Sequence, residues 1–522
     1  MRRATDEVIP GLAAVSVGDP GTPVPDGWVR VRLTDVARME SGHTPSRKHA
    51  DYWDGDVPWV GIADARVHHG KEIHSTFQTV TEKGLANSAA RWLPARTVCL
   101  SRTASVGYVT ILGRPMATSQ DFVNWVCSDA ILPEFLMYAL LAEGDHLLNF
   151  GKGSTHTTIY FPQALAFHLA LPPLAEQRRI VSKVEALLAQ VNAARERLEK
   201  VPRLLKRFRQ AVLAKAFRGE LVPTEAELAA REGRSFQSAA ELLDQSADAL
   251  SNELPGGWTK APLKDVVAFI QNGPFGSLLH RSDYISGETP LINPANIVAG
   301  RLVPDHKITV GSDVLQRLAT YVMRPGDVVV ARRGEMGRAA LVPDERAQWF
   351  CGTGCAFIRP GQSLDAKYLA MWFGTPGVRT TLETESVGAT MSNLSTRILG
   401  NLEMLIPPLT EQRRIVAKVE ALLSAAAKVE AEAERQARRL ERAPQAILQK
   451  AFSGELVPAE AELARIEGRT FESAAELLAR TGQTEAGAGQ ATARRGGGGR
   501  GEGGQAARGR RVARAPRLPL KQ

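Results

Sequence analysis

The sequence predicts an α+β protein with two globular domains of mixed α/β character and two long helical regions, related by a pseudo-two-fold internal repeat. One observation is a helical motif that occurs twice, LPPLAEQRRIVSKVEALL from Leu171 and IPPLTEQRRIVAKVEALL from Ile406, 235 positions apart. Another is AFRGELVP from Ala216, which returns as AFSGELVP from Ala451 at the same distance. The third is that, in each half of the chain, these two motifs follow a stretch of roughly 140 residues, which is long enough to bury its own core. The globular domains are therefore expected to alternate with the helical regions.

These repeats divide the chain into six parts. The first residues are punctuated by Gly and Pro without a pattern, and we interpret them as a loose arm. The last residues are rich in Gly, Ala and Arg with few aliphatic side chains, which predicts disorder. The predicted parts are the arm 1–24, the first globular domain 25–170, the first helical region 171–254, the second globular domain 255–405, the second helical region 406–480 and the tail 481–522.

The two helical regions have a coiled-coil pattern. Apolar residues recur at alternating steps of four and three from Ile180 to Val212 and again, with one Gln in the series, from Ile415 to Ile447. Each seam predicts a rod of roughly 60 Å at 1.5 Å per residue. A whole domain connects the two rods, so they can pair antiparallel. Pro202 and Pro444 lie inside the patterns and are expected to kink or break them.

Short elements are predicted at several positions outside the rods. The β-like runs are 97–100, 106–112 and 327–331. One helix is expected in the first domain, from Glu134 to Ala142. After the first rod, Thr224 and Glu227 have the spacing of a capping box at the start of a short helix.

Composition limits the class of protein. The net charge of +9 is mostly a property of the tail, since Thr481 to Gln522 carry +7 and leave +2 for the other 480 residues. An argument for nucleic-acid binding must therefore depend on local patches of charge. Four scattered cysteines do not suggest a disulfide framework. No run is apolar and long enough to span a membrane, and the first residues do not resemble a signal peptide, so we expect a cytoplasmic protein.

The sequence does not contain a convincing catalytic or metal-binding motif. The run Gly151-Lys152-Gly153-Ser154 lacks the spacing of a phosphate-binding loop. Asn272-Gly273-Pro274-Phe275 is only superficially similar to the Asn-Pro-Pro-Phe loop of adenine methyltransferases, and we interpret it as a turn. Cys351 and Cys355 lack nearby partners for a zinc site, and His68, His69 and His74 are best interpreted as a solvated loop. We therefore predict no metal and no cofactor in this chain.

The repeated motifs identify a family resemblance. The two PPLxEQRRIVxKVEALL segments, the two AFxGELVP segments and the similar domain openings PDGW from Pro25 and PGGW from Pro255 resemble the specificity subunits of type I restriction-modification systems. The resemblance extends from about Pro25 to Leu478. It implies two target-recognition domains that each read one half of a split double-stranded DNA sequence. It also implies that the helical regions act as a ruler between these domains and as a docking surface for methyltransferase subunits.

The resemblance also implies what the partners contribute. Two copies of a methyltransferase subunit are expected because the docking motifs occur twice, and restriction/translocase subunits are expected to join through them. S-adenosylmethionine, ATP and Mg would then bind to the partner subunits. This chain would be a DNA-recognition subunit without catalytic activity.

The two globular domains differ in their loop sequences. Ser41-Gly42-His43-Thr44-Pro45-Ser46, followed by Tyr52-Trp53, is similar to a recognition domain of this family. The second domain has Asn272-Gly273-Pro274-Phe275-Gly276-Ser277 and lacks the Tyr-Trp pair. It is therefore expected to belong to a different recognition subtype.

Candidate functional residues follow from these patterns. Cations suit phosphates, and hydroxyl, amide and guanidinium groups can reach base edges. The DNA-binding candidates are Thr44, Ser46, Arg47, Lys48, Arg66, Lys71, Lys152, Ser154, Thr155 and His156 in the first domain, and Asn293, Asn296, Arg332, Arg333, Arg338, Ser392 and Asn393 in the second. The partner-docking candidates come from the repeated motifs: Glu176, Gln177, Arg178, Arg179, Phe217 and Glu220, with Glu411, Gln412, Arg413, Arg414, Phe452 and Glu455.

Two alternative functions stay open. The first is a self-contained DNA methyltransferase or nuclease, which the missing motifs disfavour. The second is a coiled-coil adaptor with no role on DNA. A pure adaptor would not need two divergent domains within matched frames.

Overall fold

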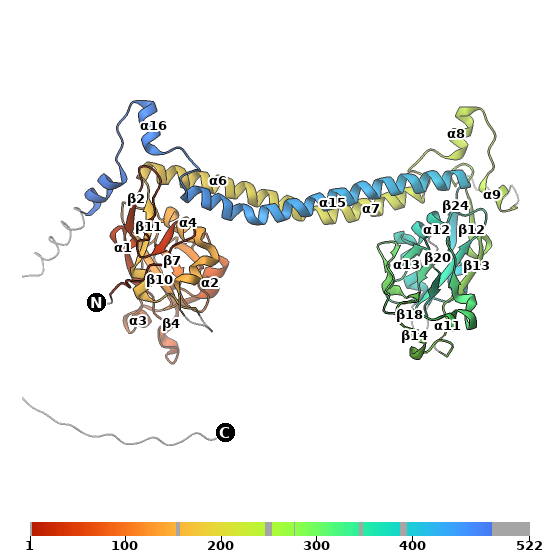
Figure 1. Cartoon of the computed structure of the whole chain (residues 1–522), viewed down its shortest axis with the longest axis horizontal. Helices are drawn as coiled ribbons and strands as arrows, with labels where there is room; N and C mark the ends of the chain where they lie inside the picture. Colours follow the sequence, from red (N-terminus) through yellow and green to blue (C-terminus); the bar gives the residue numbers. More distant parts are fainter. Residues whose placement is uncertain are drawn as a thin grey trace, which may run out of the picture. The chain divides into compact units, whose positions relative to one another are not determined.

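The computed structural model describes residues 3–152, 157–245, 253–275, 277–343, 348–386 and 394–482 (Figure 1). The tail predicted to be disordered lies outside the described residues, except for its first two positions. The chain divides into two units, which we describe separately. Unit 1 comprises Met1–Ala194 and Arg439–Gln522, and unit 2 comprises Arg195–Arg438.

Unit 1 contains the first globular domain, which is built on three sheets. The five-stranded sheet has the order β3-β10-β7-β8-β5, the second sheet has the order β6-β4-β9, and the third has the order β1-β11-β2. The strand bounds are β1 (Val15–Val17), β2 (Val29–Arg32), β3 (Ala37–Ser41), β4 (Trp53–Val60), β5 (Glu72–Ile73), β6 (Gln78–Val80), β7 (Val98–Ser101), β8 (Val109–Leu112), β9 (Ala117–Thr118), β10 (Phe122–Cys127) and β11 (Phe167–Leu171). The predicted runs at 97–100 and 106–112 are thus the strands of one hairpin.

Short helices complete this domain. They are α1 (Leu33–Val36), η1 (Ala50–Tyr52), α2 (Ile62–Val67), α3 (Glu82–Ala86), α4 (Pro133–Glu143), η2 (Gly144–Phe150) and α5 (Phe161–Leu165). The helix predicted from Glu134 to Ala142 is confirmed as α4. Its apolar residues pack with Val98, Leu100 and Val109 of the hairpin in the main core of the unit.

The predicted loose arm is wrong for the residues that the structure describes. Strand β1 pairs antiparallel with β11, and Val15 and Val17 are buried. The buried carboxylate of Glu143 accepts hydrogen bonds from four consecutive backbone N–H groups, those of Leu12 to Val15, at 2.5–3.0 Å. Since an acidic side chain 128 or more positions away supplies these acceptors, no local pattern in the arm revealed its order.

Unit 2 contains the second globular domain, in which a four-stranded sheet has the order β13-β23-β20-β21 and a five-stranded sheet the order β14-β18-β15-β22-β19. Two-stranded sheets pair β12 with β24 and β16 with β17. The strands are β12 (Thr259–Pro262), β13 (Val267–Asn272), β14 (Tyr284–Ile285), β15 (Thr289–Ile292), β16 (Ile297–Val298), β17 (Arg301–Leu302), β18 (Thr309–Val310), β19 (Val322–Met323), β20 (Val328–Ala331), β21 (Ala339–Leu341), β22 (Trp349–Cys351), β23 (Cys355–Pro360) and β24 (Glu403–Ile406). The strand predicted at 327–331 is confirmed.

The short helices of this domain include α10 (Leu263–Val266), η4 (Arg281–Asp283), η5 (Pro294–Asn296), α11 (Ser312–Arg317), η6 (Ala319–Tyr321), α12 (Ala366–Phe373), α13 (Pro376–Ser386) and α14 (Thr396–Gly400). Tyr368 and Phe373 of α12 are fully buried. They lie in one core with Val328 and Val330 of β20.

The first rod is interrupted and the second is continuous. Helix α6 (Leu174–Glu199) ends just before α7 (Val201–Ala216), at whose first turn Pro202 lies, so the predicted break occurs there. Helix α15 (Leu409–Phe452) continues through Pro444 for 44 residues. A break at Pro444 is therefore wrong, even though this proline cannot donate a backbone hydrogen bond, while the alternative, a kink, stays a prediction.

Helix packing within each unit supports an antiparallel arrangement. In unit 1, Ile180 and Val184 near the start of α6 share a core with Leu448 and Ala451 near the end of α15. In unit 2, Val212 and Ala216 at the end of α7 share a core with Ile415 and Val419 near the start of α15. The predicted seam is not buried throughout, since Phe208 and Val429 are 41% and 53% exposed.

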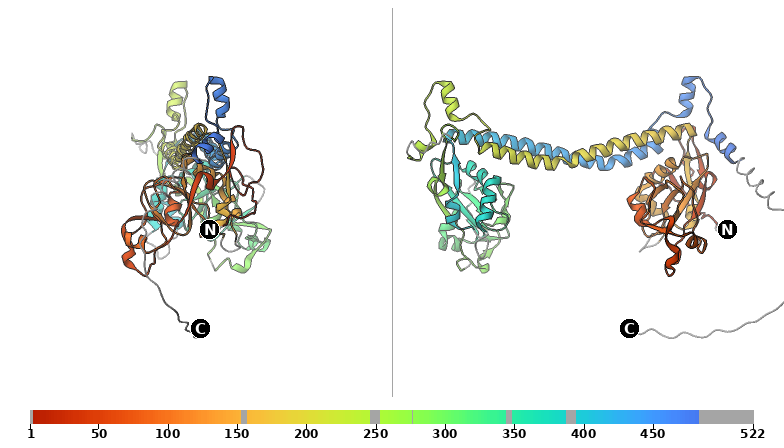
Figure 2. Two further views of the ribbon diagram at one scale, coloured as in Figure 1. Left: turned by 90° about the vertical axis from the view of Figure 1, so that its left-hand side faces the viewer. Right: turned by 180° about the vertical axis from the view of Figure 1, so that it is seen from behind.

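Two short helices follow each rod: α8 (Glu225–Glu232) and α9 (Ala239–Leu242) in unit 2, and α16 (Glu460–Glu467) with a further helix over 474–482 in unit 1. The predicted capping box of Thr224 and Glu227 is confirmed at the start of α8. Helices α8 and α16 each stand on the side of the long helices away from the globular domain of their own unit (Figure 1 and Figure 2).

Candidate functional site

Three loops meet at one end of the main sheet in both globular domains, and the same backbone hydrogen bonds connect them. In the first domain, Ser119 N donates to Val60 O at 3.0 Å and Arg102 N donates to Asp121 O at 2.7 Å. In the second, Gly352 N donates to Ile292 O at 2.9 Å and Arg332 N to Gly354 O at 3.0 Å. The turn 119–121 therefore corresponds to the turn 352–354, and both follow a strand that runs parallel to its neighbour.

A glycine makes the close approach between these loops possible. A Cβ atom at Gly42 would lie 2.0 Å from Ser119 O, and a Cβ atom at Gly273 would lie 2.0 Å from Gly352 O. Gly273 thus holds the position of Gly42, although the sequences that follow them differ. We call these matched backbone contacts, around Gly42 and the turn 119–121 in the first domain and around Gly273 and the turn 352–354 in the second, the loop frame. The two loops for which the sequence predicted different subtypes begin from this same loop frame.

The hairpin turns after β7 and β20 are the third matched feature. Ala104 and Gly107 have positive φ in the first turn, as do Gly334 and Gly337 in the second. In each domain, the segment that leads back to the rod bonds to the arginine at the equivalent position. Ile159 N donates to Arg102 O in the first domain, and Leu394 N donates to Arg332 O in the second. Exposed positions of the two turns carry different side chains, such as Arg333 in the second.

Four DNA-binding candidates lie in the loop after β3. Thr44 donates a hydrogen bond to the side-chain oxygen of Gln120. Arg47 lies with its guanidinium carbon 4.4 Å from the ring centroid of Trp53, and it donates to Gln78 Oε1 at 3.0 Å. Ser46, Arg47 and Lys48 are exposed, so this loop presents cations beside an aromatic ring.

The other candidates of the first domain are more dispersed. Arg66 is exposed in the last turn of α2, and Lys71 lies just before β5. Lys152 is exposed, forms an isolated bridge with Thr158 and makes an ion pair with Glu7 at 2.8 Å. Ser154, Thr155 and His156 lie outside the described residues.

In the second domain, two predicted base readers have local structural contacts. Arg332 is only 5% exposed, and its Nε donates to Leu394 O at 2.6 Å. Burial lowers the pKa of its guanidinium. Asn296 accepts from Asn293 N at 2.8 Å and donates to Val303 O at 2.9 Å, so its amide closes a turn. The side chains of Arg332 and Asn296 are thus used within the domain, and base reading by them stays a prediction.

The remaining candidates of the second domain are placed differently. Asn293 is half-buried beside Gly352, at the frame described above. Arg333 is exposed, and Arg338 lies 3.9 Å from Glu335. Ser392 and Asn393 lie outside the described residues.

The repeated EQRR motifs form a joint between each domain and the helices. In unit 1, Glu176 accepts from Trp28 Nε1 at 2.7 Å and from Glu460 N at 2.8 Å. Arg179 makes an ion pair with Glu460 and donates to Pro458 O at 3.2 Å. One carboxylate therefore connects the opening of the first domain, the start of α6 and the start of α16.

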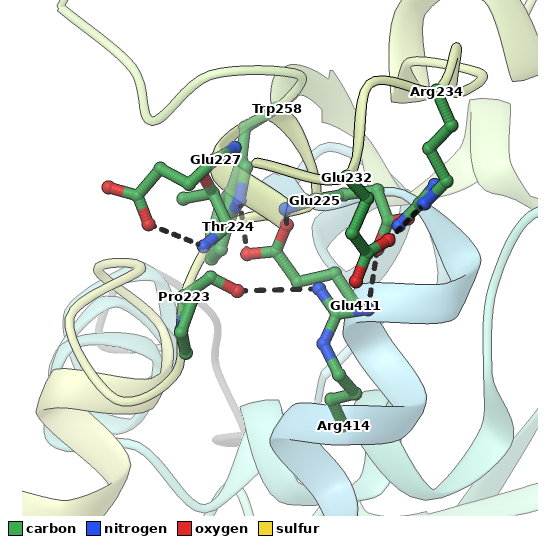
Figure 3. A network of polar contacts seen from close by, with 9 residues as sticks. All are labelled: Pro223, Thr224, Glu225, Glu227, Glu232, Arg234, Trp258, Glu411 and Arg414. Atoms are coloured by element: carbon green, nitrogen blue, oxygen red, sulfur yellow. Dashed lines mark hydrogen bonds and ion pairs between the residues drawn. The ribbon is translucent and has the colours of Figure 1, made fainter. Parts of the chain in front are cut away.

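Unit 2 repeats this joint contact for contact (Figure 3). Glu411 accepts from Trp258 Nε1 at 2.8 Å and from Glu225 N at 2.7 Å. Arg414 makes an ion pair with Glu225 at 2.5 Å and donates to Pro223 O at 3.3 Å. In both units, the short helix that follows one copy of the repeat is thus attached to the beginning of the other copy.

The glutamine of each EQRR motif and the phenylalanine of each AFxGELVP motif make further contacts at the joints. Gln177 accepts from Leu132 N at 2.9 Å, where α4 begins, and Gln412 accepts from Asp365 N at 2.7 Å, where α12 begins. The ring of Phe452 lies 5.2 Å from Phe135, and in unit 2 the rings of Phe217 and Tyr368 are 4.8 Å apart.

These contacts change the interpretation of the docking candidates. A buried side chain has no surface to offer a partner in this conformation, so the structure gives six of them an intramolecular role: Glu176, Gln177, Phe217, Glu411, Gln412 and Phe452. Arg179 and Arg414 are half-buried in the joints. The exposed candidates are Arg178, Glu220, Arg413 and Glu455, and docking through them stays a prediction.

The joint carboxylates have opposite pKa shifts. Burial raises the pKa of Glu176 and of Glu411. Burial acts in the same direction on Glu460 and Glu225, but hydrogen bonds from Arg469 and Arg179, and from Arg414 and Arg234, outweigh it and hold the pKa of these carboxyls below the usual value.

In the part of the chain that the structure describes, the His, Cys, Asp and Glu side chains form no group of three or more that could hold a metal ion. None of the helices in that part combines the length and apolarity needed to cross a membrane. Burial raises the pKa of Cys355 to about 12, and its thiol is buried, as is that of Cys351.

Comparisons with known proteins agree with the repeated architecture. Residues 25–203 and 255–437 both match the family described as the type I restriction modification DNA specificity domain. The EcoBI specificity subunit of Escherichia coli is 30% identical over 289 residues, which cover 55% of this chain and 58% of that subunit. The EcoKI specificity subunit of Escherichia coli strain K12 is 24% identical over 83% of this chain and 90% of its own length.

Solved structures agree on the fold. The HsdS subunit from Thermoanaerobacter tengcongensis matches with a TM-score of 0.57 at 22% identity, over 84% of this chain and 99% of that one.

The matches to the EcoBI and MjaIX subunits are partial, covering 58% and 42% of those relatives, respectively.

Proposed function

The chain belongs to the family of type I restriction modification DNA specificity proteins, and we propose that it is the sequence-specificity subunit of a type I restriction-modification complex. In this role each globular domain reads one half of a bipartite double-stranded DNA site. The observation that carries the proposal is the matched pair of loop frames, which present different exposed side chains. This arrangement suits two domains that recognise different base sequences. The matched backbone contacts position each loop, and the exposed side chains of that loop specify the bases.

We also propose that the helices set the distance between the two half-sites. The 44-residue helix α15 begins in unit 2 and ends in unit 1, so it is continuous with both joints. An α-helix of this length extends about 66 Å at 1.5 Å per residue. An antiparallel coiled coil with pseudo-two-fold symmetry would then act as the ruler.

The partner subunits carry the chemistry in this proposal. Two methyltransferase subunits dock through the repeated helical regions, and restriction/translocase subunits join through them, all in the cytoplasm. The partners bind S-adenosylmethionine, ATP and Mg, while this chain has no catalytic role. Support comes from the duplicated joints, which present the same exposed motif residues twice.

The test is to express the chain with its candidate methyltransferase partner and to map modified adenines at base resolution. A split motif with a fixed nonspecific spacer is expected, and it should vanish when either subunit is omitted. Methylation by the purified chain alone would support a self-contained enzyme. A complete lack of sequence-specific DNA binding by the complex would instead support an adaptor.

A further inference from the structure

The turn Ser119–Asp121 in the first domain is held rigidly on both sides. Ser119 Oγ lies 3.0 Å from Asp121 Oδ2 and accepts from Asp121 N at 3.2 Å. Arg102 fixes the carbonyl groups of the turn, since its N donates to Asp121 O at 2.7 Å and its Nη2 donates to Gln120 O at 2.9 Å. Gln120 therefore has a fixed backbone between two buried strands, β9 and β10.

The side chain of Gln120 is exposed and oriented. Its Oε1 accepts a hydrogen bond from the hydroxyl of Thr44, which lies in the loop after β3. A carbonyl oxygen has two acceptor sites, so this bond leaves one of them open, beside the NH₂ group of the same amide. The amide thus presents an acceptor and a donor side by side to solvent.

A glutamine amide in this orientation matches one base. Adenine offers N7 as an acceptor and N6–H₂ as a donor in the major groove, and Gln pairs with both in a bidentate manner. Guanine offers two acceptors at the same edge, and an amide cannot satisfy both with one donor and one acceptor. The donor and the acceptor of the amide therefore favour adenine over guanine.

The second domain has the same turn with a different tip. Gly352 N, Arg332 N and Cys355 N make the bonds that Ser119 N, Arg102 N and Phe122 N make in the first domain. Thr353 lies at the position of Gln120 and is half-buried. One rigid frame thus carries a long amide in one domain and a short hydroxyl in the other.

We propose that Gln120, oriented by Thr44, is a specificity-determining residue that reads an adenine in one half-site, and that Thr353 holds the equivalent position for the other half-site. The inference rests on the proposed function, because it names the contact by which the first domain reads its bases. Neither Gln120 nor Thr353 was among the residues predicted from sequence, since a Ser-Gln-Asp turn has no distinctive local pattern.

The experiment uses the full chain in complex with its methyltransferase partner and compares the methylated motifs of wild type and variants. For Gln120→Ala, discrimination should fall by about 5- to 150-fold at one base pair of one half-site, which is the effect of a bidentate contact. For Gln120→Glu, preference at that position should move from adenine to cytosine, because a carboxylate accepts from cytosine N4. A merely structural role would not change the identity of the preferred base.

Two further variants keep the test decisive. Thr44→Val should weaken discrimination at the same base pair, which covers the case in which the Gln120 variants fail to fold. Thr353→Ala should affect only the other half-site. Asn87→Ala, an exposed amide whose Nδ2 donates to Lys83 O at 2.9 Å, is the control and should leave the motif unchanged.

The two possible failures can be distinguished. A wild-type complex without any sequence-specific methylation or binding would contradict the proposed function itself. A wild-type complex with a split motif, which stays identical in the folded variants of Gln120 and Thr44, would overturn the assignment of Gln120 and leave the proposed function standing.

Discussion

The joints of the two units make the same contacts, whereas the loop tips carry different side chains on a matched backbone. At the joints, a tryptophan, a glutamate and the start of a short helix form the same bonds in unit 1 and unit 2. At the tips, Gln120 stands where Thr353 stands in the other domain. Buried polar groups must keep their partners, while exposed side chains on a rigid frame can change without loss of stability. The comparison predicts that joint variants alter stability and tip variants alter DNA recognition.

The largest effect is expected from loss of a joint tryptophan. Trp258→Ala removes a fully buried ring and the donor to Glu411, so the free energy of unfolding should fall by about 3–5 kcal/mol. Trp92, which is 50% exposed, provides the matched control. Chemical denaturation of both variants tests this, and equal effects would show that the joint does not stabilise unit 2.

A smaller effect is expected for the joint carboxylates. Glu411→Gln replaces one acceptor by an NH₂ group that faces a donor, and we expect a loss of about 1–3 kcal/mol in the free energy of unfolding. Glu176→Gln should cost the same in unit 1. Glu420→Gln removes an exposed ion pair with Lys367 and should have little effect. Unequal losses in the free energy of unfolding for Glu411→Gln and Glu176→Gln would show that the two joints are not equivalent.

The pH dependence of the joint follows from the lowered pKa of Glu460. Its stabilising contribution should be present above the usual value of 4.5 and should be lost as the pH falls through its lower value in the folded state. The free energies of unfolding of wild type and Glu460→Gln should therefore converge below pH 4.5. Glu176, with a raised pKa, should not contribute to this loss. A difference between the two proteins that grows toward low pH would contradict the assigned sign.

The smallest effect on stability is expected at a loop tip. Arg333→Ala should change the free energy of unfolding by less than about 0.5 kcal/mol because the residue is exposed. If Arg333 contacts a phosphate, binding of the complex should weaken equally on all sequences, with the salt slope reduced by about 1. DNA titrations at several salt concentrations measure both quantities. A changed motif with an unchanged salt slope would make Arg333 a base reader.

The sequence predicted the features that depend on local pattern. The helix α4, the strand β20, the capping box at Thr224 and the break at Pro202 follow from periodicity, turn residues and capping chemistry. The prediction from sequence failed where residues far apart in the chain determine the local structure. The N-terminal arm, for example, is ordered by hydrogen bonds to Glu143. Continuity through Pro444 was another failure, since packing along a 44-residue helix can outweigh one missing hydrogen bond.

For the candidate sites, the sequence indicated residue types but not the contacts that these residues make. The repeated EQRR and AFxGELVP motifs were predicted to dock partner subunits, but the glutamate and glutamine of EQRR and the phenylalanine of AFxGELVP are buried in the joints. Arg332 and Asn296 have residue types suited to base reading, yet their contacts are within the domain. Residue type indicates what a side chain can bind, and only the fold shows which groups are still available.

Because the two joints make the same contacts, we expect that a domain carries its own half-site specificity and can be moved from one joint to the other. This expectation can be tested with a chain that lacks residues 1–24 and has 259–405 in place of 29–170, so that Trp28, Glu176 and the repeated motifs are retained. Mapping of methylated adenines is the measurement. The account predicts that both half-sites become the sequence that the second domain reads in the wild-type motif. A folded, partner-bound chain that still methylates the original asymmetric motif would contradict it.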